Sequence, residues 1–238
     1  MALAERVAIV TGAGGGLGRE VAAGLATAGA AVVLVGSDQA RMDALGQGLG
    51  LAPERWLGLG ADLHDESAAK QMVDTVVTRF GRVDILIHLV GGWAGGTPVT
   101  ELAAAEIQAM LDQHLWTAFN VTRALVPHLV AAGWGRVLAV STPVAADPPR
   151  EQAAYAIGKA AAAALFGTLA REVAGSGVTV NLVRVRKIDV EHARDADGAP
   201  RGAASWTTPE EIAAALLYLC SDEAGAVNGA RIPLYGAT

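Results

Sequence analysis

Short apolar runs rich in β-branched residues alternate with longer Ala- and Leu-rich segments along this chain. The runs are apolar throughout, which is typical of strands that helices cover on both faces. Five of them are predicted as strands: Val7 to Val10, Ala31 to Val35, Val83 to Leu89, Arg136 to Val140 and Val178 to Val183. The alternation predicts an α/β fold, a doubly wound (Rossmann) parallel sheet with helices on both faces, formed by a single domain over residues 1–238.

The segments between the strands have helical character. The predicted helices are Leu17 to Ala28, Glu66 to Phe80, Thr100 to Ala132 with a break or bend near Pro127, Gln152 to Ala174, and Pro209 to Ser221. In the last helix, Thr208 is the predicted N-cap and Pro209 the predicted first residue. Glu211 is the predicted partner of Thr208 in a capping box. Residues 186–206 are the least regular, and ligands bind at the carboxyl ends of the strands in such sheets, so we expect a mobile substrate lid there.

Charge and cysteine content exclude several classes of function. The net charge of −6 lacks the basic excess that nucleic-acid binding needs. A single cysteine, Cys220, cannot form an internal disulfide, and no leader pattern opens the chain, so we expect a cytoplasmic protein. The mean hydropathy is +0.36, but the Ala-rich window from Tyr155 to Ala174 contains Lys159 and predicts a buried helix, not a membrane span. We expect no membrane partner and no metal site.

The first strand leads directly into a glycine-rich run. Its residues are Thr11, Gly12, Ala13, Gly14, Gly15, Gly16, Leu17 and Gly18. Glycines here permit a tight turn and let backbone N–H groups approach a pyrophosphate at the positive end of the next helix, while Gly18 lets that helix pack close to the strand. The position between a strand and a helix favours a phosphate-binding loop over an ordinary glycine-rich turn.

Two further positions bear on a dinucleotide. After the second strand, Gly36 offers no carboxylate to repel a 2′-phosphate and Ser37 could hydrogen-bond one, with Arg19 and Arg41 near in sequence. The carboxylate of Asp38 favours NAD, but these features together favour NADP(H) slightly. Asp62, followed by Leu63, comes after the third strand. It is predicted either to accept a hydrogen bond from the adenine amino group or to be an N-cap or turn residue.

Tyr155 and Lys159 lie four residues apart, on one face of a predicted helix. At this spacing the ammonium can lower the pKa of the phenol and ready it for proton exchange. Tyr-x-x-x-Lys is common by chance, but its place after the fifth strand of a dinucleotide fold favours a catalytic pair over a surface pair.

Together the glycine run, Asp62, the Asp84-Ile85-Leu86 strand and Tyr155-x-x-x-Lys159 resemble the short-chain dehydrogenase/reductase family across essentially the whole chain. The resemblance implies a seven-stranded parallel sheet, a bound nicotinamide cofactor, hydride transfer, and usually a homotetramer. It implies that Tyr155 donates or accepts the proton and that Lys159 holds the nicotinamide ribose. The further cofactor residues it implies are Leu63, Leu89, Val90, Gly91 and Ile188.

Four positions depart from the family pattern. His88-Leu89 replaces the usual pair of asparagines after the fourth strand, and Val185-Arg186 replaces Pro-Gly after the sixth. Thr142, with Ser141 beside it, takes the place of the serine that polarises the substrate carbonyl, and threonine keeps that hydroxyl donor. His114 takes the place of an asparagine. It is predicted to relay a proton or bind water, or simply to pack and hydrogen-bond locally.

The run from Gly91 to Gly96, with Trp93 at its centre, resembles dihydropteridine reductase, a subgroup that acts on a flat quinonoid pterin. An indole beside a glycine-rich wall suits a planar ring, although Trp93 is equally predicted as a core or interface residue. The leading hypothesis is an NAD(P)H-dependent reductase of a carbonyl or a planar quinonoid or cyclic substrate, with Tyr155 as proton donor.

Two other classes of function remain open. The altered motif positions allow a dinucleotide-binding sensor module with little or no hydride transfer, although the intact Tyr155 and Lys159 count against it. The apolar helix faces allow a structural partner subunit in a mixed oligomer. The expected partners are a small-molecule substrate and further copies of the chain, as a tetramer or dimer.

Overall fold

One sheet of seven strands, all paired in parallel, forms the centre of the computed structural model, which describes residues 3–236. The first two and last two residues of the expected domain lie outside this description. The strands are β1 (Val7–Thr11), β2 (Ala31–Gly36), β3 (Trp56–Gly60), β4 (Ile85–His88), β5 (Gly135–Ser141), β6 (Val178–Val185) and β7 (Arg231–Leu234). The strand order is β3-β2-β1-β4-β5-β6-β7. Strands β2 and β3 lie on one side of β1 and strands β4 to β7 lie on the other, so the order switches sides between β1 and β4. Ligands bind at this switch point in open α/β sheets.

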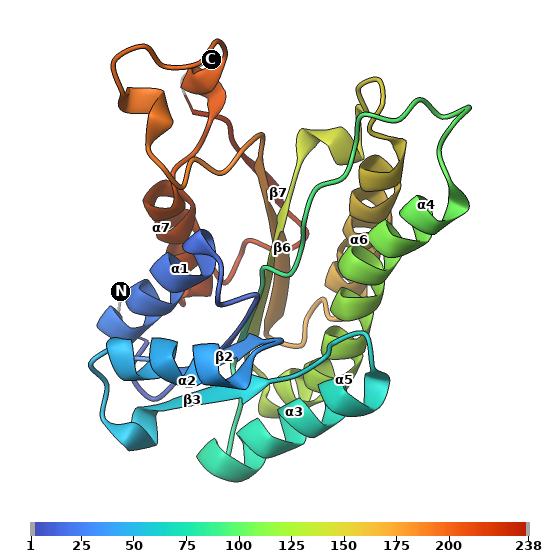
Figure 1. The fold of residues 1–238 in the computed structure, drawn as a ribbon. Helices are drawn as coiled ribbons and strands as arrows, with labels where there is room; N and C mark the ends of the chain where they lie inside the picture. Colours follow the sequence, from blue (N-terminus) through green and yellow to red (C-terminus); the bar gives the residue numbers. More distant parts are fainter. Residues whose placement is uncertain (1–2, 237–238) are drawn as a thin grey trace.

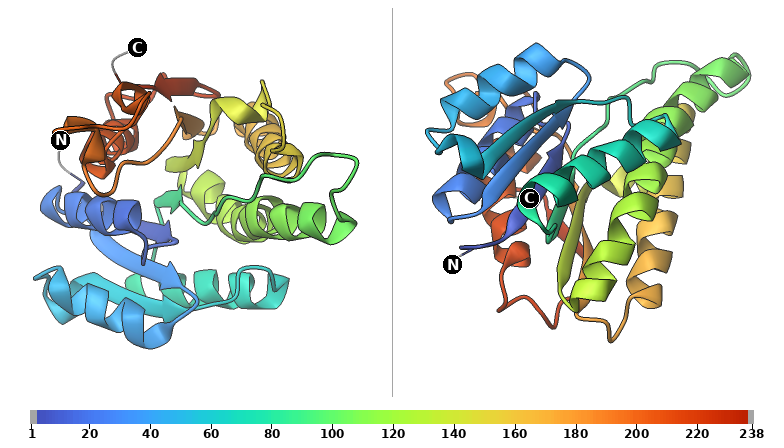
Figure 2. Two further views of the ribbon diagram at one scale, coloured as in Figure 1. Left: turned by 45° about the horizontal axis from the view of Figure 1, so that its top comes forward. Right: turned by 90° about the horizontal axis from the view of Figure 1, so that it is seen from below.

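Helices cover both faces of the sheet, which confirms the predicted doubly wound architecture (Figures 1 and 2). One face carries α1 (Gly16–Thr27), α2 (Gln39–Gly48) and α7 (Pro209–Cys220); the other carries α3 (Glu66–Phe80), α4 (Ala104–Leu111), α5 (Thr117–Ala132) and α6 (Ala153–Glu172). The segment between β4 and α4 and the segment between β6 and α7 extend from the same end of the sheet (Figure 1).

Two apolar cores, one on each face, explain why the strands are apolar throughout. Adjacent residues of a strand point to opposite faces of the sheet. Ile9 accordingly packs with the core under α3, α5 and α6, whereas Val10 packs with the core under α1 and α7. Both side chains are fully buried, so a polar residue at either position would lose water without gaining a partner.

The predicted helix from Thr100 to Ala132 is wrong in its start and in its break. It begins at Ala104, and a π-helical turn at Asp112–Trp116 interrupts it, whereas α5 runs through Pro127 without a break. Pro127 is exposed, so water can satisfy the carbonyl group that its missing N–H leaves free. π-Helical turns are frequent at functional sites, and this one carries His114.

Helix caps account for two other helix starts. The predicted capping box of α7 is confirmed: Thr208 Oγ1 accepts from the Glu211 N–H at 3.4 Å, and the Thr208 N–H donates to Glu211 Oε2 at 2.9 Å. Helix α2 was not predicted, because only Met42 and Gly46 are buried on it and its apolar stripe is weak. Its N-cap is Asp38, whose carboxylate accepts from the Arg41 N–H at 3.1 Å.

Among the described residues, α6 is the one helix with the length and apolar composition of a membrane-crossing segment. In the fold it packs against α4 and β6, and Ala163, Phe166 and Ala170 are buried on it. Only 33% of its apolar window is buried, so the expectation of a buried helix holds for these side chains and not for the helix as a whole.

Candidate active site

The glycine loop between β1 and α1 forms a tight cradle. A Cβ on Gly12, whose φ is +69°, would lie 2.9 Å from the Leu89 carbonyl carbon, and a Cβ on Gly18 would lie 2.6 Å from Gly12 O. Gly15 is the N-cap of α1, with no side-chain cap and no acidic residue in the first turn. The N-terminal N–H groups and the helix dipole are therefore available to an anion. This geometry fits the pyrophosphate of a dinucleotide.

Two clefts meet at this loop. The β2 cleft, of about 690 Å³, extends toward the ends of β2 and β3. The β5 cleft, of about 780 Å³, extends toward the ends of β5 and β6. Together they are lined by most of the predicted cofactor residues, namely Gly12, Gly14, Gly15, Gly16, Leu17, Gly18, Ser37, Asp62, Leu63, Leu89, Val90, Gly91, Tyr155, Lys159 and Ile188. Thr11 is the exception, because its buried side chain turns away from both clefts.

Thr11 instead holds His88, which replaces the first family asparagine. The Thr117 hydroxyl donates to Gln113 O at 2.7 Å, so it can only accept from His88 Nε2, at 3.4 Å. His88 Nδ1 then accepts from Thr11 Oγ1 at 2.9 Å. Burial lowers the pKa of His88 to about 3, with Lys159 contributing in the same direction. His88 is thus a neutral buried side chain that ties β4 to β1 and α5.

In the β2 cleft, the acidic side chains have local partners. The Asp38 carboxylate caps α2, and the Arg41 guanidinium donates to Gly14 O. Asp62 Oδ1 accepts from the His64 N–H at 3.0 Å, which is turn geometry. The N-cap of α3 is Asp65, so the N-cap alternative for Asp62 is wrong. Asp62 nevertheless lines the cleft with Ser37.

Tyr155 and Lys159 lie in the first turns of α6 and face the β5 cleft, as their spacing predicts. Lys159 Nζ donates to Val140 O at 3.1 Å and lies 6.0 Å from the centroid of the Tyr155 ring. Burial lowers the pKa of Lys159 to about 8. Burial also raises the pKa of Tyr155, against a smaller lowering effect of the Thr142 hydroxyl. The predicted lowering of the Tyr155 pKa by Lys159 is therefore not found in this structure.

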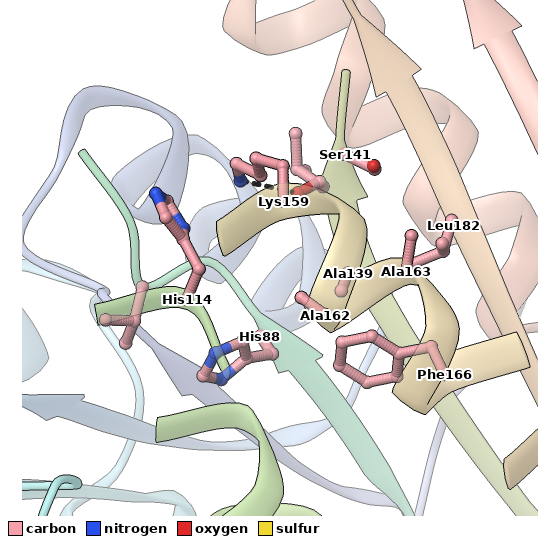
Figure 3. A pocket seen from close by; sticks show the side chains of 11 residues that line it. His88, His114, Ala139, Ser141, Lys159, Ala162, Ala163, Phe166 and Leu182 are labelled. Carbon is pink, nitrogen blue, oxygen red and sulfur yellow. Dashed lines mark hydrogen bonds between the residues drawn. The ribbon is translucent and has the colours of Figure 1, made fainter. Parts of the chain in front are cut away.

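His114 lies in the π-helical turn and packs edge-on against Tyr155, with ring centroids 5.6 Å apart. Its Nε2–H donates to Gly92 O at 3.1 Å, because a carbonyl oxygen can only accept. Burial lowers its pKa to about 3. Its side chain does not line the β5 cleft. It borders a cavity of about 20 Å³, around which His88, His114 and Lys159 lie (Figure 3). This volume suits a single water molecule.

The end of β5 places its two hydroxyl groups differently. Ser141 lines the β5 cleft. Thr142, the predicted carbonyl-polarising residue, is buried, and its hydroxyl accepts from the Val144 N–H at 3.4 Å. The side chain of Thr142 acts on the phenol of Tyr155, whose pKa it lowers, whereas Ser141 lines the cleft.

The outer wall of the β5 cleft contains Trp93, which the sequence predicted as a substrate residue, and residues of the predicted lid segment 186–206. Trp93 lines the cleft and is 63% exposed, so it is not a core residue. Arg186, Lys187 and Val190 line it from the segment after β6. Val190 packs on the glycine loop, because a Cβ on Gly16 would lie 2.7 Å from its side chain. The sequence did not single out Arg186, Lys187 or Val190; its signals for this part of the wall were the predicted lid at residues 186–206 and the departure from Pro-Gly at Val185-Arg186.

Comparison with known proteins identifies the family of this chain. The family model described as short chain dehydrogenase matches residues 6–199. The chain belongs to the short-chain dehydrogenase/reductase family. As a member, it is an NAD(P)-dependent oxidoreductase that acts on a small-molecule substrate. The likeness of the Gly91 to Gly96 run to dihydropteridine reductase stays a prediction.

Relatives of this short-chain dehydrogenase/reductase span its length. It is 30% identical to D-threitol dehydrogenase of Mycolicibacterium smegmatis, over 97% of this chain and 92% of the relative. It is 31% identical to cis-4-hydroxycyclohexanecarboxylate dehydrogenase of Sinomonas cyclohexanicum, over 99% and 97%. The crystal structure of a 3-ketoacyl-(acyl-carrier-protein) reductase from Brucella melitensis complexed with NADH shares the fold, with a TM-score of 0.87, 24% identity and 98% of each chain covered.

Proposed function

We propose that this protein is an NAD(P)H-dependent reductase that delivers hydride to the carbonyl or quinonoid carbon of a planar or cyclic substrate, with Tyr155 as proton donor. The observation that carries the proposal is the β5 cleft. It brings Tyr155 and Lys159 to one side, the glycine loop to another, and the exposed indole of Trp93 to its outer wall.

The two clefts divide the cofactor between them. The adenosine half would lie in the β2 cleft against Ser37, Asp62 and Leu63, and the pyrophosphate at the N-terminus of α1. The nicotinamide half would lie in the β5 cleft, between Leu89, Val90, Gly91 and Ile188, with Lys159 holding its ribose. When bound, the nicotinamide supplies the hydride.

The protein side chains supply the proton. Burial keeps the phenol of Tyr155 protonated at neutral pH by raising its pKa, so Tyr155 can donate to the oxygen of the reduced group. Negative charge then develops on the phenolic oxygen. Lys159, anchored on Val140 O, is proposed to support this step by holding the nicotinamide ribose beside Tyr155. Ser141 on the cleft wall, with Thr142 beside the phenol, would polarise the substrate oxygen.

His114 is proposed to position Tyr155 by edge-on packing, while its unprotonated Nδ1 remains able to accept a hydrogen bond in a proton relay.

A slight preference for NADP(H) over NAD(H) is part of this proposal, and two features of the β2 cleft support it. The carboxylate of Asp38 caps α2 and so is engaged by the Arg41 N–H. The guanidinium of Arg41, held at Gly14 O, lines the same cleft as Ser37 and would pair with a 2′-phosphate. Titration of cofactor fluorescence tests this choice: tighter binding of NADH than of NADPH would contradict it.

The segment 186–206 is proposed as a lid of a single domain over residues 1–238. Its Val190 end packs on the glycine loop, and its Asp189 carboxylate accepts from the N–H groups of Ala193 and Arg194 at 3.0 and 2.8 Å. The family resemblance further supports a cytoplasmic homo-oligomer, a tetramer or a dimer.

Oxidation of NADPH and NADH with a panel of cyclic ketones, diketones, quinones and quinonoid pterin tests the reaction. The cis-4-hydroxycyclohexanecarboxylate dehydrogenase relative supports the inclusion of cyclic compounds. Turnover of one or more planar or cyclic members supports the proposal. Tight cofactor binding without turnover of any member would contradict it and favour a binding module.

A further inference from the structure

The ionisable residues that line the β5 cleft, apart from Tyr155, are all cationic. They are Lys159, Arg186 and Lys187, and no Asp or Glu within residues 3–236 lines this cleft. The chain as a whole has a net charge of −6. The cleft is therefore a local concentration of cations on an acidic protein, which favours an anionic ligand.

The position of these cations separates them from the pyrophosphate site. Arg184 of β6 pairs in register with Ser141 of β5, so Arg186 and Lys187 follow at the Ser141 end of the cleft. Val190 lies further along the same segment and packs on Gly16 of the glycine loop. In this segment, the apolar Val190 thus contacts the glycine loop, whereas the cationic Arg186 and Lys187 lie nearer to Ser141.

Both cations are held in place without being neutralised. Arg186 Cζ lies 5.0 Å from the centroid of the Tyr235 ring, and Lys187 Nζ lies 3.4 Å from that of Trp206. Neither side chain forms a salt bridge to a carboxylate in the part of the chain that the structure describes. A cation–π contact restricts the side chain but leaves its charge free for a ligand. By contrast, Arg194 of the same segment is paired with Glu211 and Asp195.

We propose that the substrate of the β5 cleft carries a carboxylate or an equivalent anionic group on a flat ring, and that Arg186 and Lys187 bind this group. The ring lies against the exposed indole of Trp93, and the anion lies at the Ser141 end of the cleft. This inference rests on the proposed function, because it places the substrate in the same cleft.

Binding to the holoenzyme tests the inference without turnover, so its outcome is independent of whether Tyr155 donates a proton. The probes are 2-naphthoate and its neutral analogue 2-naphthamide, titrated by calorimetry against protein saturated with NADP⁺. We expect 2-naphthoate to bind about tenfold more tightly than 2-naphthamide, because a charged hydrogen bond that stays partly exposed to water contributes about that much to the affinity. The double variant Arg186→Gln, Lys187→Gln should bind both probes equally.

The matched control is Arg201→Gln, an exposed arginine of the same segment that does not line the cleft. It should retain the preference for 2-naphthoate. The Kd of NADP⁺ should change by less than about twofold in the double variant, which also shows that the variant is folded. Absence of a carboxylate preference in the wild-type protein, including failure of both probes to bind, overturns the inference. So does loss of NADP⁺ affinity in a double variant that keeps the preference, because the cations would then serve the cofactor.

Discussion

His88 and His114 are held neutral by burial, and this makes the stability of the protein depend on pH. Burial lowers the pKa of each from 6.5 to about 3. Between these values the unfolded chain binds protons that the folded chain does not. The stabilising contribution is therefore complete above pH 6.5 and is lost as the pH falls toward 3.

The lowered pKa values of the two histidines determine how much stability is lost at acidic pH. At pH 5, 1.5 units below the unfolded pKa, each histidine contributes a loss of about 2 kcal/mol, so the pair contributes about 4 kcal/mol. This is a large fraction of the roughly 5–15 kcal/mol by which native proteins are stable. Urea unfolding, followed by circular dichroism at pH 7 and at pH 5, measures it.

The variants separate these histidines from other titrating groups. In His88→Asn, His114→Asn, the loss of unfolding free energy between pH 7 and pH 5 should shrink by about 4 kcal/mol, whatever the stability at pH 7. The control His128→Asn changes an exposed histidine of α5 and should keep the wild-type loss. An unchanged loss in the double variant would refute the buried, neutral assignment.

Three further predictions follow from the clefts. Because burial lowers the pKa of Lys159 to about 8, kcat/KM should fall as the pH rises through about 8 and its ammonium is lost; a profile flat from pH 6 to 10 would contradict its role. Arg41→Ala should raise the Kd of NADPH about tenfold and that of NADH by less than about twofold in fluorescence titrations, and equal effects would argue against 2′-phosphate binding. Gly18→Ala places a methyl group 2.6 Å from Gly12 O, so it should cost about 1–3 kcal/mol in unfolding free energy and weaken cofactor binding, and an unaffected Kd would count against the cradle.

Local sequence was sufficient where a short-range pattern determines the structure. The apolar strands predicted a sheet covered on both faces, and Ile9 and Val10 indeed enter opposite cores. Thr208 and Glu211 predicted the cap of α7, and the spacing of Tyr155 and Lys159 predicted their common face.

Long-range packing determined what the sequence could not show. The environment of His88 depends on Thr11 and Thr117, which lie far from it in the chain. No residue pattern distinguishes the π-helical turn from an ordinary α-helix in the sequence. The break was expected at Pro127 because proline lacks an N–H, but the helix is interrupted at Asp112–Trp116 instead. The charge of Arg186 was visible in the sequence, but its place in the wall of the β5 cleft follows from how the segment after β6 crosses the sheet edge.

The central claim is that Tyr155 donates the proton in a nicotinamide-dependent reduction, and Tyr155→Phe tests it most directly. With a substrate found in the panel, steady-state kinetics should show kcat lowered by at least about 10²-fold, the scale of a lost general acid. The Kd of NADPH, measured by fluorescence titration on the same preparation, should stay within about twofold of the wild-type value. Turnover at the wild-type rate in a variant that binds NADPH normally would contradict the mechanism.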